Sequence, residues 1–535
     1  MLPQETRLEI EAEGSPESNE HAALAQGWIL DLDTRQPVWT QRDARGRRDR
    51  RSDNWQVEDE ITLPAGTYGV YFGAFSGHRP VNKKLKVFGL ELGSFDLSVG
   101  PKRDWDEEGD PDSWGIWVYA ASAGVERGAV PAEVPPPFPE AIVRYLGLGD
   151  GEHHEVRIDL DKDVEFKLWA TGEHGGSGKK NFADTAWIVD LKDWSRVWEL
   201  STDDTESYGG ARKNRVFDGR LRMPAGSYLV SVATDPSHAY GSWNDLPPWD
   251  PDSWGLALSL VDSDDRSSVH VDRETARPEP QVEIRRVRSG EFIQKPFVVD
   301  QEVKVLVRAL GERPRGDKEF ADFGWIERQD TFEAVWRMED GPVAPAGGGS
   351  KNRLVEDLVM LEPGGYALCY LTDDSHAYGD WNTDPPFDPS SWGVSIATVD
   401  AVAGSAISEG TTESETAVIS LAPVRDGEHV VKRFQTVEST RVRIFALGEG
   451  QDGDMYDYGW LEESETGEEI WAMTYSETRR AGGARKNREE TVVLDLPPGT
   501  YELHYRTDGN HSFGDWNASP PRQPHLWGLT LVELP

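Results

Sequence analysis

Three loops gather residue types that could bind a ligand, hold a metal or do chemistry: Asp, His, Asn and Trp at fixed spacing. They read TDPSHAYGSWN at 234–244, TDDSHAYGDWN at 372–382 and TDGNHSFGDWN at 507–517. Each has an Asp three residues before its His and a Trp five residues after it, and each runs on to a second Trp in a Pro-x-x-Trp-Gly motif. Loops of roughly 20 residues are uncommon in compact domains unless they are functional or pinned in place.

A basic triplet lies upstream of each loop, after a Gly-Gly-x-x sequence. The first triplet, Lys213-Asn214-Arg215, opens a segment that runs to the turn glycine Gly226 and then returns toward the loop. In an antiparallel hairpin the start of the first strand lies beside the end of the second. We therefore expect each triplet to meet the Asp, His and Trp residues of its loop. The predicted cluster comprises Lys213, Asn214, Arg215, Asp235, His238, Trp243 and Trp254; Lys351, Asn352, Arg353, Asp373, His376, Trp381 and Trp392; and Lys486, Asn487, Arg488, Asp508, His511, Trp516 and Trp527.

Two interpretations of this cluster stay open. In the structural one, Arg pairs with Asp, Asn bonds to backbone groups and the tryptophans cover the open end of a β-sandwich, because a long loop needs its backbone groups satisfied. In the binding one, flat aromatic faces flanked by polar side chains hold a sugar, and repetition adds avidity. The binding interpretation implies a glycan or cell-surface partner.

Metal binding and catalysis have less support. The DPDSW sequences at 110–114 and 250–254, with Asp388, offer oxygen ligands for Ca²⁺, but the corresponding pair in the last loop is Gln523-Pro524 and the sequence has no EF-hand spacing. Zinc would need more His or Cys ligands. No nucleophile recurs beside the repeated His, since Ser237 and Ser375 precede it twice but Asn510 the third time. We predict no cofactor beyond a candidate Ca²⁺ ion, and no enzyme activity.

The loops belong to a unit that occurs four times. Trp28, Trp187, Trp325 and Trp460 each precede another Trp by 11 residues, and Asn54, Asn214, Asn352 and Asn487 each precede a glycine by 12. A fourth His, His78, stands at the equivalent place in the first unit. The sequence therefore predicts four copies, at residues 1–122, 140–262, 280–401 and 417–535, joined by Pro-rich or polar linkers at 124–140, 263–280 and 402–416.

Within each copy the apolar period is two, which is typical of half-buried strands. The segment 302–310 places Val303, Val305 and Val307 on one face, and 164–170 and 441–447 repeat that alternation. We predict an all-β fold of four tandem antiparallel β-sandwiches, jelly-roll-like, with seven or eight short strands each. By the same alternation, Cys369 is expected on an outer surface.

The order of these strands is similar to that of bacterial pre-peptidase C-terminal domains and related jelly-roll modules. The similarity rests on a strand at "G-E-F/H", a "V-x-V/I" strand and the "L-P-A-G-T-Y" turn. It implies an accessory module of the kind found on exported proteins. It carries over no site residue, because that family's loops lack H-x-x-G-x-W-N.

The first copy departs from the other three. LEIEAEG at 8–14 aligns with VRIFALG at 442–448, so the strand expected before it is missing, and about 20 extra residues follow His78. Either the chain starts upstream, with a lost signal peptide, or a partner supplies the strand. Taken literally, the N-terminus has no apolar signal core and favours the cytoplasm, whereas a truncated start favours export to the cell surface.

Composition excludes several classes of function. Asp and Glu number 96 against 56 Lys and Arg, and a net charge of −40 repels nucleic acid. One Cys excludes an internal disulfide framework, and no apolar run is long enough to span a membrane. We expect a non-catalytic scaffold or adhesion protein with weak multivalent binding at the loop ends. The alternatives are carbohydrate-binding accessory modules of a hydrolase system, or purely structural repeats, with or without Ca²⁺.

Overall fold

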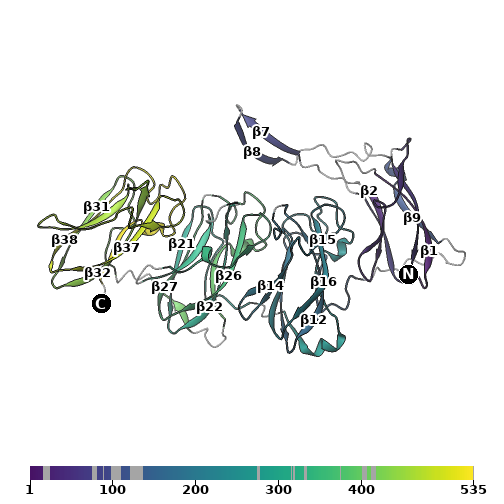
Figure 1. Cartoon of the computed structure of the whole chain (residues 1–535), viewed down its shortest axis with the longest axis horizontal. Coiled ribbons are helices and arrows are strands. Elements are labelled where there is room, and N and C mark those ends of the chain that lie inside the picture. Colours follow the sequence, from purple (N-terminus) through teal and green to yellow (C-terminus); the bar gives the residue numbers. More distant parts are fainter. Residues whose placement is uncertain are drawn as a thin grey trace. The chain divides into compact units, whose positions relative to one another are not determined.

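The computed structural model describes residues 1–15, 25–52, 54–74, 81–87, 90–97, 110–120, 136–176, 178–273, 277–314, 316, 320–329, 334–373, 375–399, 406–410 and 417–533. Throughout this part of the chain, strands pair only antiparallel and helices are 3-10 turns of three to six residues (Figure 1). The all-β class predicted from the sequence is confirmed. His78, the fourth repeated His, lies outside the described residues.

Copy 2 shows the arrangement most fully, with two sheets of five strands. The first sheet has the order β10 (Val143–Leu146), β18 (Gly255–Leu260), β12 (Val164–Glu173), β16 (Asn214–Met223) and β15 (Glu206–Ser207). The second has the order β14 (Ser195–Glu199), β13 (Thr185–Asp190), β17 (Gly226–Ala233), β11 (His153–Leu160) and β19 (Val269–Asp272). Consecutive strands therefore alternate between sheets in several places, as in a β-sandwich.

The core of copy 2 lies between these sheets. Val164, Phe166 and Leu168 of β12 are buried, and they join Ile158 of β11 and Ile188 of β13 in one apolar cluster. Side chains two residues apart share a face of a strand, so the alternating apolar pattern places one face of each sheet in the core. The apolar residues that alternate in the sequence are thus the residues buried between the two sheets.

Copies 3 and 4 repeat this strand order. Copy 3 has β20 (Val282–Arg285), β28 (Gly393–Thr398), β22 (Val303–Glu312), β26 (Asn352–Leu361) and β25 (Val343–Pro345) in one sheet, and β24 (Ala334–Arg337), β23 (Phe323–Arg328), β27 (Gly364–Leu371), β21 (Phe292–Val299) and β29 (Ile407–Glu409) in the other. In copy 4, the first sheet consists of β30 (Ala417–Ser420), β39 (Gly528–Glu533), β32 (Thr440–Gln451), β37 (Asn487–Leu496) and β36 (Arg479–Arg480). The short strand β33 (Asp454–Met455) pairs with β32 beside this sheet. Its second sheet is β31 (His429–Thr436), β38 (Gly499–Arg506), β34 (Tyr458–Glu463) and β35 (Glu469–Ala472).

Copy 1 has smaller sheets. One is β4 (Gly46–Arg48), β5 (Trp55–Leu63), β1 (Thr6–Gly14) and β9 (Gly115–Ala120), and the other is β3 (Pro37–Thr40), β2 (Ala25–Asp31) and β6 (Tyr68–Ala74). Among the described residues, counterparts of β10 and β11 are lacking, so β9 and β6 are edge strands. A hairpin of β7 (Val81–Val87) and β8 (Leu90–Leu97) forms the extra segment.

Two segments expected to be linkers contain strands instead. Residues 263–280 include β19, which pairs with β11, and residues 402–416 include β29, which pairs with β21. Short alternating sequences such as VHVD at 269–272 are sufficient to add an edge strand to a sheet. The linker boundaries drawn from composition alone were therefore too wide.

The chain divides into two compact units rather than four. Unit 1 contains Met1–Ala276 with Gly347–Ser350 and Asp384–Phe387, and unit 2 contains Arg277–Ala346, Lys351–Thr383 and Asp388–Pro535. The four-domain division stays a prediction about folding units. Across the part of the chain that is described, no helix is long and apolar enough to cross a membrane.

Candidate functional site

A buried Asn–His pair lies at one end of copies 2, 3 and 4. In copy 2, β16 begins at Asn214 and β17 ends two residues before Asp235, so the hairpin brings the triplet and the loop together. His238 Nε2 lies 2.6 Å from Asn214 Oδ1, and both side chains are completely buried. The distance is again 2.6 Å for His376–Asn352 and for His511–Asn487.

The Asn side chain ties the loop to the strand. Asn214 Nδ2 donates to the carbonyls of Gly209 and Leu246, each at 2.9 Å, and Asn487 does the same to Gly482 at 2.8 Å and Ser519 at 2.9 Å. Because both amide hydrogens are donated, Oδ1 must accept, and the network assigns the imidazole proton to Nε2. The pair therefore fixes the loop backbone at two points.

Burial keeps the three histidines neutral. Together with the charge of the neighbouring lysine, it lowers the pKa of His238 to about 3 and those of His376 and His511 to about 4. The uncharged imidazole donates its one N–H to Asn, so Nε2 has no lone pair with which to accept a further proton.

The glycines of the Gly-Gly-x-x-Lys motif allow the loop to approach. Gly210 and Gly483 have φ of +58° and +61°, in the left-handed region that favours glycine. A Cβ on Gly210 would lie 1.9 Å from Pro247 O, and one on Gly483 would lie 1.9 Å from Pro520 O. These glycines therefore lie where the end loop approaches the backbone just before the strand too closely for a side chain to fit.

Two tryptophans cover the pair in each copy. Trp254 is fully buried, and Trp243 lies edge-on to it at 5.2 Å and edge-on to His238 at 5.0 Å. The same arrangement recurs with Trp381 and Trp392 at 5.0 Å, and with Trp516 and Trp527 at 5.0 Å. Edge-to-face contacts between rings are favourable, so the loop ends in a packed aromatic lid.

A buried Asp anchors this lid, and the sequence analysis did not find it. Asp184 Oδ2 accepts from Trp254 Nε1 at 2.8 Å, and its Oδ1 accepts from the backbone N–H of Asp235 at 2.7 Å. Asp322 and Asp457 hold Trp392 and Trp527 in the same way, each at 3.0 Å. Each of these residues stands three positions before the repeated strand Trp, a recurrence that could have identified them.

The Lys and the Arg of each basic triplet have different partners, and the Lys lies just before its strand begins. Lys213 Nζ lies 2.8 Å from Glu173, Lys351 lies 2.9 Å from Glu312 and Lys486 lies 2.9 Å from Glu449. Arg instead turns away from the loop: Arg488 Nε donates to Thr478 Oγ1 at 2.8 Å, and Arg215 Nε donates to Thr205 Oγ1 at 3.2 Å.

The predicted Arg–Asp pairing is therefore wrong. Asp235 Oδ1 accepts from the Ser237 N–H at 2.8 Å and thereby fixes the first turn of the loop. The reason is the strand period, because Arg and Asn are adjacent and so point to opposite faces.

Three carboxyl groups converge beside each lysine. In copy 2 these are Glu173, Asp184 and Asp235, whose nearest oxygens lie within 4.8 Å of one another, and the triads Glu312–Asp322–Asp373 and Glu449–Asp457–Asp508 match it. Burial raises the pKa of Glu173 to about 7 and that of Asp235 to about 6. A cation stabilises such a group, and here the lysine ammonium supplies one.

The residues proposed for Ca²⁺ have other partners. Asp250 is fully buried and pairs with Arg35 at 3.2 Å, and Asp388 pairs with Arg308 at 3.2 Å. Asp110 accepts from Ser113 Oγ at 3.1 Å. Two of these three carboxylates thus already face a guanidinium.

Copy 1 keeps Asn54 but with different contacts. Asn54 Nδ2 donates to Glu13 Oε1 at 2.7 Å, and Trp114 Nε1 donates to Asn54 Oδ1 at 3.0 Å. In the sequence, the three positions of the acidic triad carry Ser15, Ala25 and Phe75 here, and Asp53 stands in place of lysine. Copy 1 therefore has neither the acidic triad nor the lysine of the other copies, but Trp114 is still held, here by Asn54.

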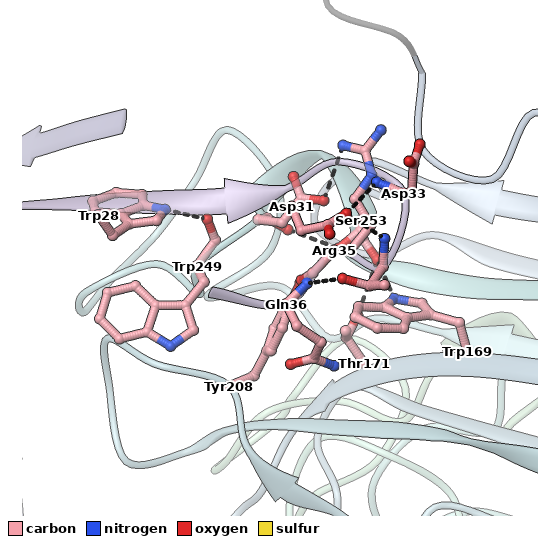
Figure 2. A network of polar contacts seen from close by, with 12 residues as sticks. Trp28, Asp31, Asp33, Arg35, Gln36, Trp169, Thr171, Tyr208, Trp249 and Ser253 are labelled. Carbon is pink, nitrogen blue, oxygen red and sulfur yellow. Dashed lines mark hydrogen bonds and ion pairs between the residues drawn. The ribbon is translucent and has the colours of Figure 1, made fainter. Parts of the chain in front are cut away.

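Within unit 1, the segment before the Pro-x-x-Trp-Gly motif of copy 2 packs on copy 1. Trp28 Nε1 donates to Trp249 O at 2.8 Å, and the two rings lie 5.5 Å apart (Figure 2). Tyr208 OH donates to the Arg35 carbonyl at 3.0 Å, and the Arg35–Asp250 ion pair is buried beside it. We call this set of contacts the first joint.

Within unit 2, the matching segment of copy 4 packs on copy 3. Gln523 Nε2 donates to Glu327 Oε2 at 2.7 Å, and His525 stacks on Phe292 at 4.8 Å. We call these contacts the second joint. Glu327 is 1% exposed, and Cys369 beside it is fully buried, so the prediction of an outer-surface Cys369 is wrong. Cys369 does point away from the core of its own copy, but that face of the sheet is covered.

No protein-family model matches the chain, and no curated protein matches it. Among solved structures, the chain is similar to the CBM32-1, CBM32-2 and M60 catalytic domains of ZmpB from Clostridium perfringens, with 7% identity and a TM-score of 0.12. The match covers 70% of this chain and 51% of that one, so the chain spans about half of its length. Such a TM-score supports no shared function, and the resemblance to pre-peptidase C-terminal domains is supported only as far as a β-rich fold.

Proposed function

We propose that the chain is a non-catalytic scaffold in which each end loop closes its own β-sandwich, and in which the loops of copies 2 and 4 also join their copy to the preceding one. The single observation that carries this proposal is the buried Arg35–Asp250 ion pair, which links copies 1 and 2. Removing one partner of a buried pair leaves an uncompensated charge, so such a pair holds two surfaces in one arrangement. In a site for a diffusing ligand, the carboxylate of Asp250 would be open to the ligand, whereas here Arg35 of the neighbouring copy occupies it.

The two joints use the same part of the loop. Trp249 and Asp250 stand directly before Pro251, and Arg522 and Gln523 stand directly before Pro524. Arg522 adds an ion pair with Glu339 of copy 3 at 3.0 Å. Since the inner part of the loop binds its own Asn and His, one loop serves two purposes: it closes a copy and contacts its neighbour.

Thermal unfolding of the full chain tests this function. We expect Asp250→Ala to lower the melting temperature of copies 1 and 2 together, because it leaves Arg35 buried without its carboxylate. The matched change Asp388→Ala removes a carboxylate at the corresponding position of copy 3 and should leave copy 1 unaffected. If Asp250→Ala leaves the unfolding of copy 1 unchanged, the loop does not join the copies.

Glycan binding is the second candidate, and one observation favours it. Trp243, Trp381 and Trp516 are only half-buried, and each is followed directly by an Asn of the loop. Aromatic rings exposed in this way are used to stack against sugars. The test is co-sedimentation of the full chain with insoluble polysaccharides, in which replacement of all three tryptophans by Ala must abolish binding.

A further inference from the structure

Copy 4 carries two glutamates directly opposite each other on its outer sheet. Glu462 of β34 pairs in register with Glu502 of β38, and His504 lies two residues further along β38, on the same face. Like charges at directly opposed positions of an antiparallel pair destabilise a sheet. A positive charge between the two carboxylates would relieve this repulsion.

The three side chains present their ligand atoms to one another. His504 Nε2 lies 3.4 Å from Glu462 Oε1 and 3.7 Å from Glu502 Oε2, and the three atoms lie within 4.8 Å of one another. His504 is 8% exposed, and its Nε2 is buried without a hydrogen-bond partner. These separations exceed the roughly 2.7–2.9 Å of a charge-assisted hydrogen bond.

Neighbouring groups occupy the other atoms of the ligands. Trp460 Nε1 donates to Glu462 Oε2 at 3.4 Å, and Ser464 Oγ donates to Glu502 Oε1 at 3.1 Å. Arg433 Nε also lies 3.4 Å from Glu502 Oε1. Each carboxylate is thus held by one oxygen and offers the other to the cluster.

The imidazole of His504 is held in the same manner. Its Nδ1 lies 3.3 Å from His429 Nε2, and its ring stacks on Trp460 at 4.7 Å with an angle of 6°. Metal-binding histidines characteristically use their second ring nitrogen in a hydrogen bond that fixes the ring and the tautomer. With the proton on Nδ1, His504 Nε2 has a free lone pair directed at the two glutamates.

We propose that Glu462, Glu502 and His504 form a binding site for a divalent transition metal ion such as Zn²⁺. Ligand atoms about 2.0–2.1 Å from a tetrahedral Zn²⁺ lie about 3.4 Å from one another, which matches the two distances from His504 Nε2. One imidazole and two carboxylates leave a fourth position for water or for a group from another molecule.

Copy 3 shows that this face is used differently elsewhere. Its counterparts of Glu462, Glu502 and His504 are Glu327, Ala367 and Cys369, and Glu327 accepts from Gln523 in the second joint. The metal ligands therefore occur in copy 4 and not in copy 3. In copy 3 the same face of the sheet contacts the end loop of copy 4. The proposal does not depend on the scaffold function.

Calorimetric titration of the metal-free full chain with ZnCl₂ tests the site, with CoCl₂ as a spectroscopic probe of coordination. We expect one equivalent of tight binding, and a visible Co²⁺ absorption typical of a low-coordinate site. His504→Ser and Glu502→Ala introduce the residues that copies 2 and 3 carry in these slots, and each should weaken Zn²⁺ binding at least tenfold.

Two controls separate this site from others. Glu449→Gln alters an acidic triad of the same copy and should leave the Zn²⁺ titration unchanged, and circular dichroism of each variant checks that it is folded. Absence of Zn²⁺ binding by the wild-type chain would mean that His504 forms an ion pair only. Binding that survives in both folded variants, or is lost with Glu449→Gln, would also overturn the proposal.

Discussion

His376 donates a 2.6 Å hydrogen bond from Nε2 to Oδ1 of Asn352, and both side chains are fully buried beneath the loop tryptophans. The two residues are 24 positions apart in sequence, as are their counterparts in copies 2 and 4. This pair is the contact by which the end loop is fastened to the β-sandwich.

The first prediction concerns that pair. Asn352→Ala or His376→Ala leaves buried polar groups without a partner, so each should lower the free energy of unfolding of copy 3 by about 1–3 kcal/mol. Denaturant titration followed by Trp fluorescence measures the loss. The control Tyr378→Ala removes a half-buried side chain of the same loop and should cost less. Equal stability of all three variants and the wild type would show that the pair does not fasten the loop.

The second prediction concerns pH. Burial raises the pKa of Glu173 to about 7 and that of Asp235 to about 6, so the folded state holds protons more tightly than the unfolded state. Their contribution to the free energy of unfolding is fully present at pH values below the pKa that these carboxyl groups have in the unfolded chain. It is lost as the pH rises through their folded-state pKa values, from 6 to 7. His238, lowered to about 3, acts in the opposite direction, and its contribution is lost only as the pH falls below its ordinary value of 6.5. We expect the free energy of unfolding to fall between about pH 6.5 and 8.

Glu173→Gln is the variant that checks this pH dependence. It removes one titrating group of the triad, so unfolding curves of the variant at pH 6.5 and 8 should differ less than those of the wild type. The exposed Glu206→Gln serves as the control, because it removes the same charge from a solvated position. A wild type that becomes more stable over this interval would contradict the assignment.

The third prediction concerns the first joint. Arg35→Met alone leaves Asp250 buried and unpaired and should cost about 3–5 kcal/mol, and Asp250→Leu alone should cost a similar amount. The double variant removes both charges and should recover most of the loss, because well-packed apolar residues can replace a buried ion pair. Calorimetric melting of the three variants completes the cycle. Additive losses in the double variant would mean that the two charges do not interact.

Much of this architecture was predictable from the sequence, for a physical reason. Strands that bury one face must alternate, so Val303, Val305 and Val307 indicated β22 directly. Hairpin geometry then placed Asn352 near His376, although their contact is not local in sequence.

The features that the sequence did not predict depend in part on what covers the outer face of a sheet. The alternation of apolar and polar residues along a strand does not predict that. Cys369 points away from its own core, yet it is fully buried beside Glu327, the residue that accepts from Gln523 of copy 4. Asp322 was missed because an isolated Asp before a strand looks like a solvated turn residue. Arg353 follows Asn352 directly at the start of β26, so the strand period turns it away from the loop that Asn352 contacts.

Reactivity of Cys369 measures the central claim most directly, because it is the one thiol of the chain and lies under the second joint. Burial raises the pKa of this thiol well above its ordinary value. We predict that a thiol reagent such as dithionitrobenzoate labels the native chain far more slowly than the unfolded chain. Labelling should accelerate at least tenfold when Gln523→Ala and His525→Ala are combined. Trp249→Ala, which alters the first joint, should leave the rate unchanged. Rapid labelling of the native wild type, at the rate of the unfolded chain, would contradict the account.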